Sequence, residues 1–209
     1  MAVAAIISDF GGVLTTPLVE SFMAVQDRTG VETAALGRAM GKIAADEGKH
    51  PLFELECGRI TEAAFLERLA GALEHELGHR PELQRFGELY FEALHPNPPM
   101  IDLMRELRGE GYRMAMLTNN VREWEPRWRS MLPVEEIFEL VVDSAFVDCR
   151  KPDPRIFEIT LERLGVSAGE CLFIDDIEVN CEGARALGIR AVHFRDAEQA
   201  IPEIRRALA

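Results

Sequence analysis

Three acidic side chains are the residues of this chain whose types and spacing are best suited to chemistry. Asp9 follows the apolar stretch 3–8, and Asp175 and Asp176 follow another at 171–174. Two carboxylates about 4 Å apart repel each other by about 4 kcal/mol at an effective dielectric of 20. Three can stay ionised together only with a cation among them, and ligands that are all oxygen favour Mg²⁺ over zinc. If the fold gathers these side chains, they form a magnesium site.

Two further segments carry groups that suit a phosphate. Thr118 and Asn119 follow a third apolar run, and Lys151 lies in the loop before a helical pattern. The hydroxyl of Thr118 and the ammonium of Lys151 are donors that phosphate oxygens accept. Backbone N–H groups after Thr118 and after Asp9, including that of Gly12, add further donors. This set predicts that a small phosphate ester binds beside the cation.

The elements that must position these residues are strands of one sheet. Short apolar runs predict five strands, at 3–8, 112–117, 138–142, 171–174 and 190–194. In the second half of the chain these runs alternate with amphipathic helical periods, which is typical of an α/β fold with a parallel, doubly wound sheet. The carboxyl ends of parallel strands meet at one edge, where such sheets bind ligands. We therefore expect the acidic and phosphate-binding residues to meet there.

The stretch from 18 to 95 is different, because it contains no convincing strand. Thr61 is predicted to begin one helix and Pro81 another, and the proline-rich segment 95–99 marks a rigid junction. A helical insertion therefore separates the first strand from the second. The predicted domains are the insertion, 15–96, and a core made of 1–14 and 97–209.

Composition excludes several classes of protein. The 209 residues are 47% hydrophobic and 28% charged, which fits one globular domain with a modest insertion. A net charge of −13 argues against nucleic acid as a partner, and no apolar run is long enough for a membrane span. The N-terminus lacks the basic region of a signal peptide, and the four cysteines have no paired or zinc-type spacing. These features predict reduced thiols and a cytoplasmic location, and a monomer and a homodimer fit equally well.

The segment from His75 to His79 matches the HExxH pattern of zinc proteases. That pattern needs both histidines on one helix face, whereas Gly78 and Pro81 predict that a helix ends between them. No third ligand follows at a specific spacing. We therefore predict a solvated helix end and no zinc site. Trp124 and Trp128 are interpreted as the packing stripe of one helix face.

Four motifs, taken together, resemble those of the haloacid dehalogenase (HAD) superfamily. They are Asp9-Phe10-Gly11-Gly12-Val13-Leu14, Leu117-Thr118-Asn119-Asn120, Arg150-Lys151-Pro152-Asp153-Pro154-Arg155-Ile156-Phe157, and Ile174-Asp175-Asp176-Ile177-Glu178-Val179-Asn180 with Cys181-Glu182-Gly183-Ala184. The chain is most similar to the subgroup that contains the N-terminal phosphatase domain of soluble epoxide hydrolase. The resemblance covers the whole chain and implies a Rossmann-like core with a helical cap in the place of residues 15–96.

The resemblance implies phosphoryl transfer with Mg²⁺ as cofactor. Asp9 is then the nucleophile that forms an aspartyl-phosphate, and Asp9, Asp176 and the carbonyl of Gly11 ligate the metal. Asp175 is implied to act beside the metal or through a metal-bound water. The residues implied for the phosphoryl group are Thr118, which binds it, and Lys151, which neutralises it, with Asn119 and Gly12 as further substrate-binding residues.

One position departs from the family pattern. Most phosphatases of this family have a second Asp two residues after the nucleophile, where this chain has Gly11. That Asp protonates the leaving group and activates water, and such help is worth roughly 10²–10⁴-fold in rate. Its loss predicts a slow enzyme, or one that prefers acyl, aryl or anomeric phosphates. Thr15, Thr16 and the cap residue Glu54 are alternative proton carriers.

Two other interpretations stay open beside the phosphatase. The 2-haloacid dehalogenases of this family also lack that Asp and need no metal, but their fourth motif resembles Ser-Ser-Asn. This chain keeps the pair Asp175-Asp176, which is electrostatically unfavourable without a metal. A weakly active or non-catalytic phosphate-binding protein is the second alternative, because a fold and a site can outlive an activity.

Overall fold

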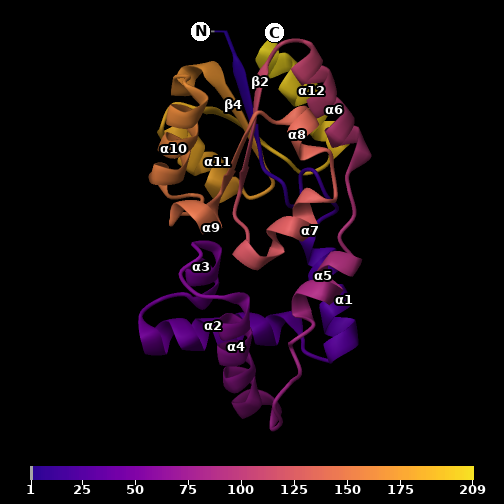
Figure 1. Cartoon of the computed structure of the whole chain (residues 1–209), viewed down its shortest axis with the longest axis vertical. Helices are drawn as coiled ribbons and strands as arrows, with labels where there is room; N and C mark the ends of the chain where they lie inside the picture. Colours follow the sequence, from indigo (N-terminus) through magenta and orange to yellow (C-terminus); the bar gives the residue numbers. More distant parts are fainter. Residues whose placement is uncertain (1) are drawn as a thin grey trace.

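The computed structural model describes residues 2–209 and shows an open sheet layer with a group of helices at one end (Figure 1). Five parallel strands have the order β3-β2-β1-β4-β5. Their bounds are β1 (Ala5–Ser8), β2 (Arg113–Thr118), β3 (Leu140–Asp143), β4 (Cys171–Asp175) and β5 (Arg190–His193). The predicted α/β class and parallel sheet are confirmed. The third strand begins two residues later than predicted, because Phe138 ends a helical turn by donating its N–H to Val134.

The central strand β1 is buried on both faces. Ile6 packs into one hydrophobic core, and its neighbours Ala5 and Ile7 pack into another, because successive side chains of a strand point to opposite faces. The first core is covered by α6 (Pro98–Gly109) and α12 (Ala197–Leu208), and the second by α10 (Pro154–Leu164) and α11 (Glu178–Ala186). This two-sided cover is the doubly wound arrangement that the sequence predicts.

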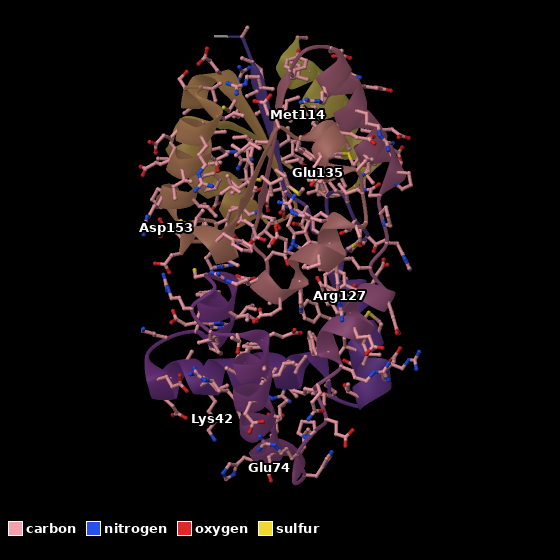
Figure 2. The ribbon with its side chains drawn as sticks, in the orientation of Figure 1. Lys42, Glu74, Met114, Arg127, Glu135 and Asp153 are labelled. Atoms are coloured by element: carbon pink, nitrogen blue, oxygen red, sulfur yellow. The ribbon has the colours of Figure 1, made fainter. Side chains whose placement is uncertain are left out.

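Five helices lie between β1 and α6 and form the group at the lower end of Figure 1. They are α1 (Leu18–Thr29), α2 (Thr33–Glu47), α3 (Pro51–Glu56), α4 (Glu62–Leu77) and α5 (Phe86–Glu92). Lys42 of α2 and Glu74 of α4 lie at the end of this group farthest from the sheet, whereas Met114 of β2 lies within the sheet layer (Figure 2).

The predictions for helix ends in this group have mixed outcomes. Thr61 caps α4 as predicted, since its hydroxyl accepts the N–H of Ala64 at 3.2 Å. The helix predicted from Pro81 is wrong at its start, because α5 begins only at Phe86. Pro81 and Leu83 are buried in an irregular segment, so tertiary packing overrides the local signal for a helix start.

The HExxH segment straddles the end of α4. This helix ends at Leu77, and Gly78 follows as its cap in the left-handed conformation, with φ at 72°. His75 lies in the last turn, and His79 lies beyond the helix. The two histidines therefore do not share one helix face, as the glycine and the proline predict.

Two connections join the helical group to the sheet layer, and they run side by side. Thr15 and Pro96 form an isolated antiparallel bridge. The N–H of Asn97 donates to the carbonyl of Leu14 at 2.8 Å. We propose this bridge as the boundary of a cap made of residues 15–96, and we use the word cap for that segment below.

Short elements complete the chain. They are η1 (Arg122–Trp124), α7 (Glu125–Arg129), α8 (Val134–Ile137), α9 (Ser144–Val147) and η2 (Ala168–Glu170). The single helix predicted for the two tryptophans is wrong, since Trp124 ends η1 and Trp128 lies in α7, fully buried against the ring of Phe10. All four cysteines are buried and unpaired. Within residues 2–209, no helix combines the length and the apolar character that crossing a membrane requires.

Candidate active site

The carboxyl ends of β1 and β4 bring the three predicted acids together. Asp9 directly follows β1, Asp175 ends β4, and the two strands pair side by side. One carboxylate oxygen from each of Asp9, Asp175 and Asp176 lies within 4.8 Å of the others. In the described part of the chain, no other group of three or more His, Cys, Asp or Glu side chains gathers this closely.

Lys151 lies inside this acidic cluster and is only 1% exposed. Its ammonium donates to Asp9 Oδ1 at 2.8 Å, to Asp175 Oδ2 at 2.6 Å and to the carbonyl of Leu117 at 2.9 Å. Burial alone would lower the pKa of Lys151, but the carboxylates of Asp175 and Asp9 outweigh burial and raise it. The ammonium therefore stays charged and fully hydrogen-bonded.

Asp175 has both carboxylate oxygens occupied. Oδ2 accepts from Lys151, and Oδ1 accepts from the N–H of Ile177 at 2.8 Å and from the amide of Asn180 at 2.9 Å. The residue is fully buried and does not line the cavity beside the cluster. These contacts position Lys151 and the start of α11, and the predicted role of Asp175 toward a metal stays a prediction.

Asp176 presents an unpaired oxygen to the site. Its Oδ1 is buried and has no hydrogen-bond partner among residues 2–209, and the side chain lines the cavity. Its other oxygen lies against the backbone of Gly12, where φ is 79° and a Cβ would overlap Oδ2. A glycine is therefore required at this position for two reasons, the backbone conformation and the close approach of Asp176.

The electrostatics of the cluster show a deficit of positive charge. Burial raises the pKa of Asp9 to about 8; Lys151 opposes this shift, and the carboxylates of Asp175 and Asp176 add to it. Burial, followed by the charge of Asp175, raises the pKa of Asp176 to about 6. One ammonium does not balance three carboxylates. The unpaired oxygen of Asp176 and the all-oxygen donor set thus fit a hard divalent cation such as Mg²⁺.

Thr118 and Asn119 reach the same edge from β2, the other neighbour of β1. Thr118 is 1% exposed and lines the cavity. The side chain of Asn119 accepts the N–H of Lys151 at 2.8 Å and donates to its carbonyl at 3.0 Å. Asn119 therefore positions the loop that carries Lys151, and its contact with a substrate stays a prediction.

The hydrogen bonds of the loop after Asp9 bear on the predicted binding of substrate by Gly12 and on the alternative proton carriers. The N–H of Gly12 donates to the hydroxyl of Thr15 at 2.9 Å, so binding a phosphate oxygen would require that hydrogen bond to break. Thr15 in turn donates to the carbonyl of Thr16 at 3.0 Å. Glu54 is paired with Arg59 at 2.8 Å. None of the three alternative proton carriers, Thr15, Thr16 and Glu54, lines the cavity.

Gly11, which stands where most phosphatases of this family have an Asp, lies next to an apolar side chain. A Cβ on Gly11 would lie 3.1 Å from both methyl groups of Leu18, the first residue of α1. Leu18 and Gly11 both line the cavity. The side chain nearest to this position thus has no proton to transfer, which agrees with the loss of the acid at Gly11.

A cavity of about 460 Å³ extends from the carboxylates between the sheet edge and the cap. Asp9, Thr118, Lys151 and Asp176 contribute its polar end. Most of its remaining wall is apolar and comes from the cap, including Leu36, Met40, Leu52, Leu55, Phe65 and Phe86. The site therefore combines a charged end with an apolar chamber.

Among the cavity residues that were not predicted for the site are four with polar or aromatic side chains in contact with each other in pairs. Glu56 of the cap and Arg150 of the core form an ion pair at 2.5 Å, and burial raises the pKa of Glu56 despite that partner. Tyr90 and Trp124 stack on each other at 5.0 Å along the wall. Arg150 lies next to Lys151 in its motif, and Trp124 was interpreted only as a packing residue. Glu56 and Tyr90 become wall residues through packing between distant segments.

A family model decides the classification. Residues 3–188 match the model of the haloacid dehalogenase-like hydrolases. The chain belongs to this family. The predicted superfamily is therefore confirmed, and the protein is a HAD-like hydrolase.

Curated relatives of this HAD-like hydrolase include phosphatases. The chain is 31% identical over 208 residues to acyl-CoA dehydrogenase family member 10 of Mus musculus, covering 98% of this chain but 19% of that protein. It is 25% identical over 215 residues to bifunctional epoxide hydrolase 2 of Sus scrofa, covering 99% of this chain and 39% of the relative. A sesquiterpene phosphatase of Aspergillus oryzae is 27% identical over 214 residues, with 97% and 95% covered. The chain thus spans less than half of the first two relatives and nearly all of the third.

Solved structures of the same fold include enzymes of two kinds. A HAD family enzyme of Bacteroides thetaiotaomicron in a magnesium complex has a TM-score of 0.69 at 24% identity, with 99% of this chain and 100% of that chain covered. An L-2-haloacid dehalogenase of Xanthobacter autotrophicus has a TM-score of 0.67 at 18% identity, with 99% and 84% covered. The likeness shows the fold, and the choice between reactions has to come from the site.

Proposed function

We propose that this HAD-like hydrolase is a Mg²⁺-dependent phosphatase that acts on a small phosphomonoester through an aspartyl-phosphate on Asp9. The observation that carries the proposal is the cluster of Asp9, Asp176 and Lys151 at the polar end of the cavity, with an unpaired oxygen on Asp176. A cation at that oxygen and a phosphate beside it would complete the charge balance of the cluster.

The metal would be held by the carboxylates of Asp9 and Asp176 and by the carbonyl of Gly11. Bound there, Mg²⁺ supplies positive charge that offsets the carboxylates and the phosphate oxygens. Curated relatives named as phosphatases support the reaction class.

The hydrogen bonds of Asp9 orient the nucleophile. Oδ1 accepts from Lys151 at 2.8 Å and from the N–H of Phe10 at 2.7 Å, and these two contacts hold the carboxylate in place. The other oxygen, Oδ2, attacks phosphorus, the bond from phosphorus to the leaving oxygen breaks, and the leaving group takes up a proton from water because Gly11 supplies none. Thr118 holds the transferring group in place, and the charge of Lys151 neutralises the nucleophile and the phosphate. A water molecule then hydrolyses the aspartyl-phosphate and regenerates Asp9.

The cavity wall favours a substrate with an apolar leaving group. Side chains of the cap contribute most of that wall, and burying an apolar group there yields about 25 cal/mol for each Å² removed from water. This gain offsets the long-range repulsion that a protein of net charge −13 exerts on an anion. The Aspergillus relative, named for a sesquiterpene substrate and covered almost completely, supports the same class.

Phosphate release with and without Mg²⁺ tests the proposal. We expect the wild-type protein to hydrolyse aryl and long-chain alkyl phosphates only with Mg²⁺, and Asp9→Asn to lower the rate by roughly 10³-fold or more. Asp196→Asn, at the N-cap of α12, is the matched control and should keep wild-type activity. Phosphate release that survives Asp9→Asn would overturn the mechanism.

Chloride release and phosphate binding, measured beside phosphate release, separate the two alternatives. A haloacid dehalogenase would release chloride from 2-chloropropionate without Mg²⁺, and a phosphate-binding protein would bind phosphate without turnover. The acid pair Asp175-Asp176 and the buried Lys151 argue against the first, because three carboxylates around one ammonium leave a negative site for an anionic haloacid.

A further inference from the structure

The second step of the proposed reaction needs a group that activates water. Once Asp9 is phosphorylated, a water molecule attacks phosphorus, and a base that takes a proton from this water accelerates the step by roughly 10²–10⁴-fold. Most phosphatases of this family have an Asp for this purpose two residues after the nucleophile, where this chain has Gly11. A substitute has to reach the side of phosphorus from which the water attacks.

The direction of that attack points to the cap. In phosphoryl transfer, the attacking oxygen and the leaving oxygen lie roughly in line through phosphorus. Asp9 follows β1 at the sheet edge, so the water approaches from the opposite side, through the space that the first leaving group has vacated. The cavity extends in this direction, between the sheet edge and the cap. A base for the water therefore belongs to the cap wall of the cavity.

Two glutamates of the cap line the cavity, Glu56 at the end of α3 and Glu62 at the start of α4. The electrostatics of Tyr90, another wall residue, distinguish Glu56. Burial raises the pKa of Tyr90; the charges of Asp9 and Asp176 raise it further, and so does the charge of Glu56. Because all three charges act on one phenol, Glu56 shares a region of the cavity with the nucleophile and with the proposed metal ligand.

The carboxylate of Glu56 is held in place by the core. The helix α3 lies against α9 (Figure 1), where the hydroxyl of Ser144 donates to the backbone carbonyl of Glu56 at 2.5 Å. Oε2 of Glu56 accepts from Nε of Arg150 at 2.5 Å, and the guanidinium of Arg150 lies 4.1 Å from the ring centre of Phe53. The side chain of Glu56 remains 15% exposed. A carboxylate accepts several hydrogen bonds, so this one can also accept from a water in the cavity.

The surroundings of Glu56 also strengthen it as a base. Burial raises its pKa, and the charges of Arg150 and Lys151 lower it without cancelling that shift. A carboxylate of higher pKa takes a proton from water more readily, and the two cations favour the ionised form that a base requires.

We propose that Glu56 is the base that activates water for hydrolysis of the aspartyl-phosphate. One proton of the water passes to the carboxylate of Glu56 while the water oxygen bonds to phosphorus, and the bond between phosphorus and the oxygen of Asp9 breaks. Inorganic phosphate and the carboxylate of Asp9 result, and Glu56 then releases its proton to solvent. The inference rests on the proposed function and adds to it a catalytic residue from the cap.

Separate measurement of the two steps tests this role. With p-nitrophenyl phosphate and Mg²⁺, p-nitrophenol reports phosphorylation of Asp9, and inorganic phosphate reports hydrolysis of the intermediate. Glu56→Gln can still accept the hydrogen bond from Arg150, but it takes up no proton. We expect a burst of about one p-nitrophenol for each active site at the wild-type rate, followed by turnover roughly 100-fold slower than in the wild type. The mass of the acid-quenched variant should show that phosphorylated protein accumulates.

Two further variants serve as comparisons. Glu56→Asp keeps a carboxylate but withdraws it by one methylene, and should show the same burst with an intermediate rate of hydrolysis. Glu67→Gln is the matched control, because Glu67 is a cap glutamate that also pairs with an arginine, Arg80, but does not line this cavity. It should keep the wild-type rates of both steps.

The two steps also separate the outcomes that would contradict these proposals. If Glu56→Gln slows the release of p-nitrophenol as much as the release of phosphate, Glu56 only positions the cap and the inference is wrong. Wild-type turnover in Glu56→Gln would overturn it as well. Failure of the wild-type protein to release p-nitrophenol with Mg²⁺ would instead contradict the proposed function, and the inference would fall with it.

Discussion

Two adjacent glycines of the first motif serve different purposes. Gly12 has a φ of 79°, and a Cβ there would overlap Oδ2 of Asp176. Gly11 has no such backbone strain, and its Cβ would meet only the flexible end of Leu18, at 3.1 Å. Any side chain at Gly12 must therefore displace the carboxylate that we propose as a metal ligand, whereas a methyl group at Gly11 needs only a small shift of Leu18.

We expect Gly12→Ala to lower kcat/KM by roughly 100-fold or more, and to raise the Mg²⁺ concentration needed for half-maximal activity. Gly11→Ala should lose much less and keep the wild-type Mg²⁺ dependence. Initial rates over a Mg²⁺ titration check both variants. Equal losses in the two variants would show that the contact with Asp176 is not what makes Gly12 necessary.

The gathering of the predicted site residues at one edge followed from the sequence, and the wall of the cavity did not. Asp9, Thr118, Lys151 and Asp176 each follow or precede an apolar run, so the rule that parallel strands end at one edge places them together. Glu56 lines the same cavity, where it pairs with the guanidinium of Arg150, 94 positions along the chain. No local pattern encodes such a contact.

The short helix α9 shows how one capping carboxylate makes an element sensitive to pH. Asp143 ends β3 and caps α9, where its side chain accepts the N–H of Ala145 at 3.0 Å, and its other oxygen is buried without a partner among the described residues. Burial raises the pKa of Asp143 to about 7, against the lowering effect of the Ala145 N–H. The native state therefore holds the proton more tightly than the unfolded chain, where the pKa is about 4.

Protonated Asp143 contributes to the free energy of unfolding. This contribution is complete below about pH 4 and is lost as the pH rises through 7. Asp143→Asn can still cap the helix but does not ionise. Its free energy of unfolding, relative to the wild type, should therefore rise between about pH 4 and pH 8 by up to about 4 kcal/mol. Urea unfolding of both proteins across this range measures the difference between their free energies of unfolding. The contributions of the other titrating groups are the same in both proteins and cancel in this difference. Parallel stability curves would contradict the assignment.

Element types were easier to predict than element ends. The five strands were found because each is a short apolar run beside turn residues, and β1 and β4 were placed to within a few residues. The start of α5 was missed because Pro81 is favoured at the first turn of a helix, whereas here it is buried in an irregular segment that also buries Leu83. Burial of side chains, which a local signal does not contain, decided that boundary.

At the scale of the whole molecule, the active-site cavity depends on how the cap sits on the core. The hydroxyl of Ser144 in α9 donates to the carbonyl of Glu56 in α3 at 2.5 Å, and Arg59 donates to the carboxylate of Asp148 at 2.6 Å. These contacts join segments about 90 positions apart. The sequence therefore predicts a cap and a core, but not the contacts between them. Those contacts position Leu55 and Glu56, both of which line the cavity.

Gly58 lies at this boundary between cap and core. Variants of Gly58 and Gly48 can therefore distinguish the stability of the cap from its position on the core. Gly58 and Gly48 have nearly the same backbone, with φ at 69° and 71°. A Cβ on Gly48 would meet nothing within 4 Å, whereas a Cβ on Gly58 would overlap the carbonyl oxygen of Ala145 in the core. Alanine at either position therefore has the same backbone strain, about 1 kcal/mol. Only Gly58→Ala must also push α3 away from α9.

We expect both alanine variants to lose stability in thermal unfolding, and only Gly58→Ala to lose activity. Its kcat/KM should fall roughly tenfold or more, because a shift of the cap wall moves the bound substrate away from Asp9. Gly48→Ala should keep the wild-type kinetics, which removes backbone strain as the explanation. If both variants lose activity to the same extent, the contact between Gly58 and the core does not position the cavity.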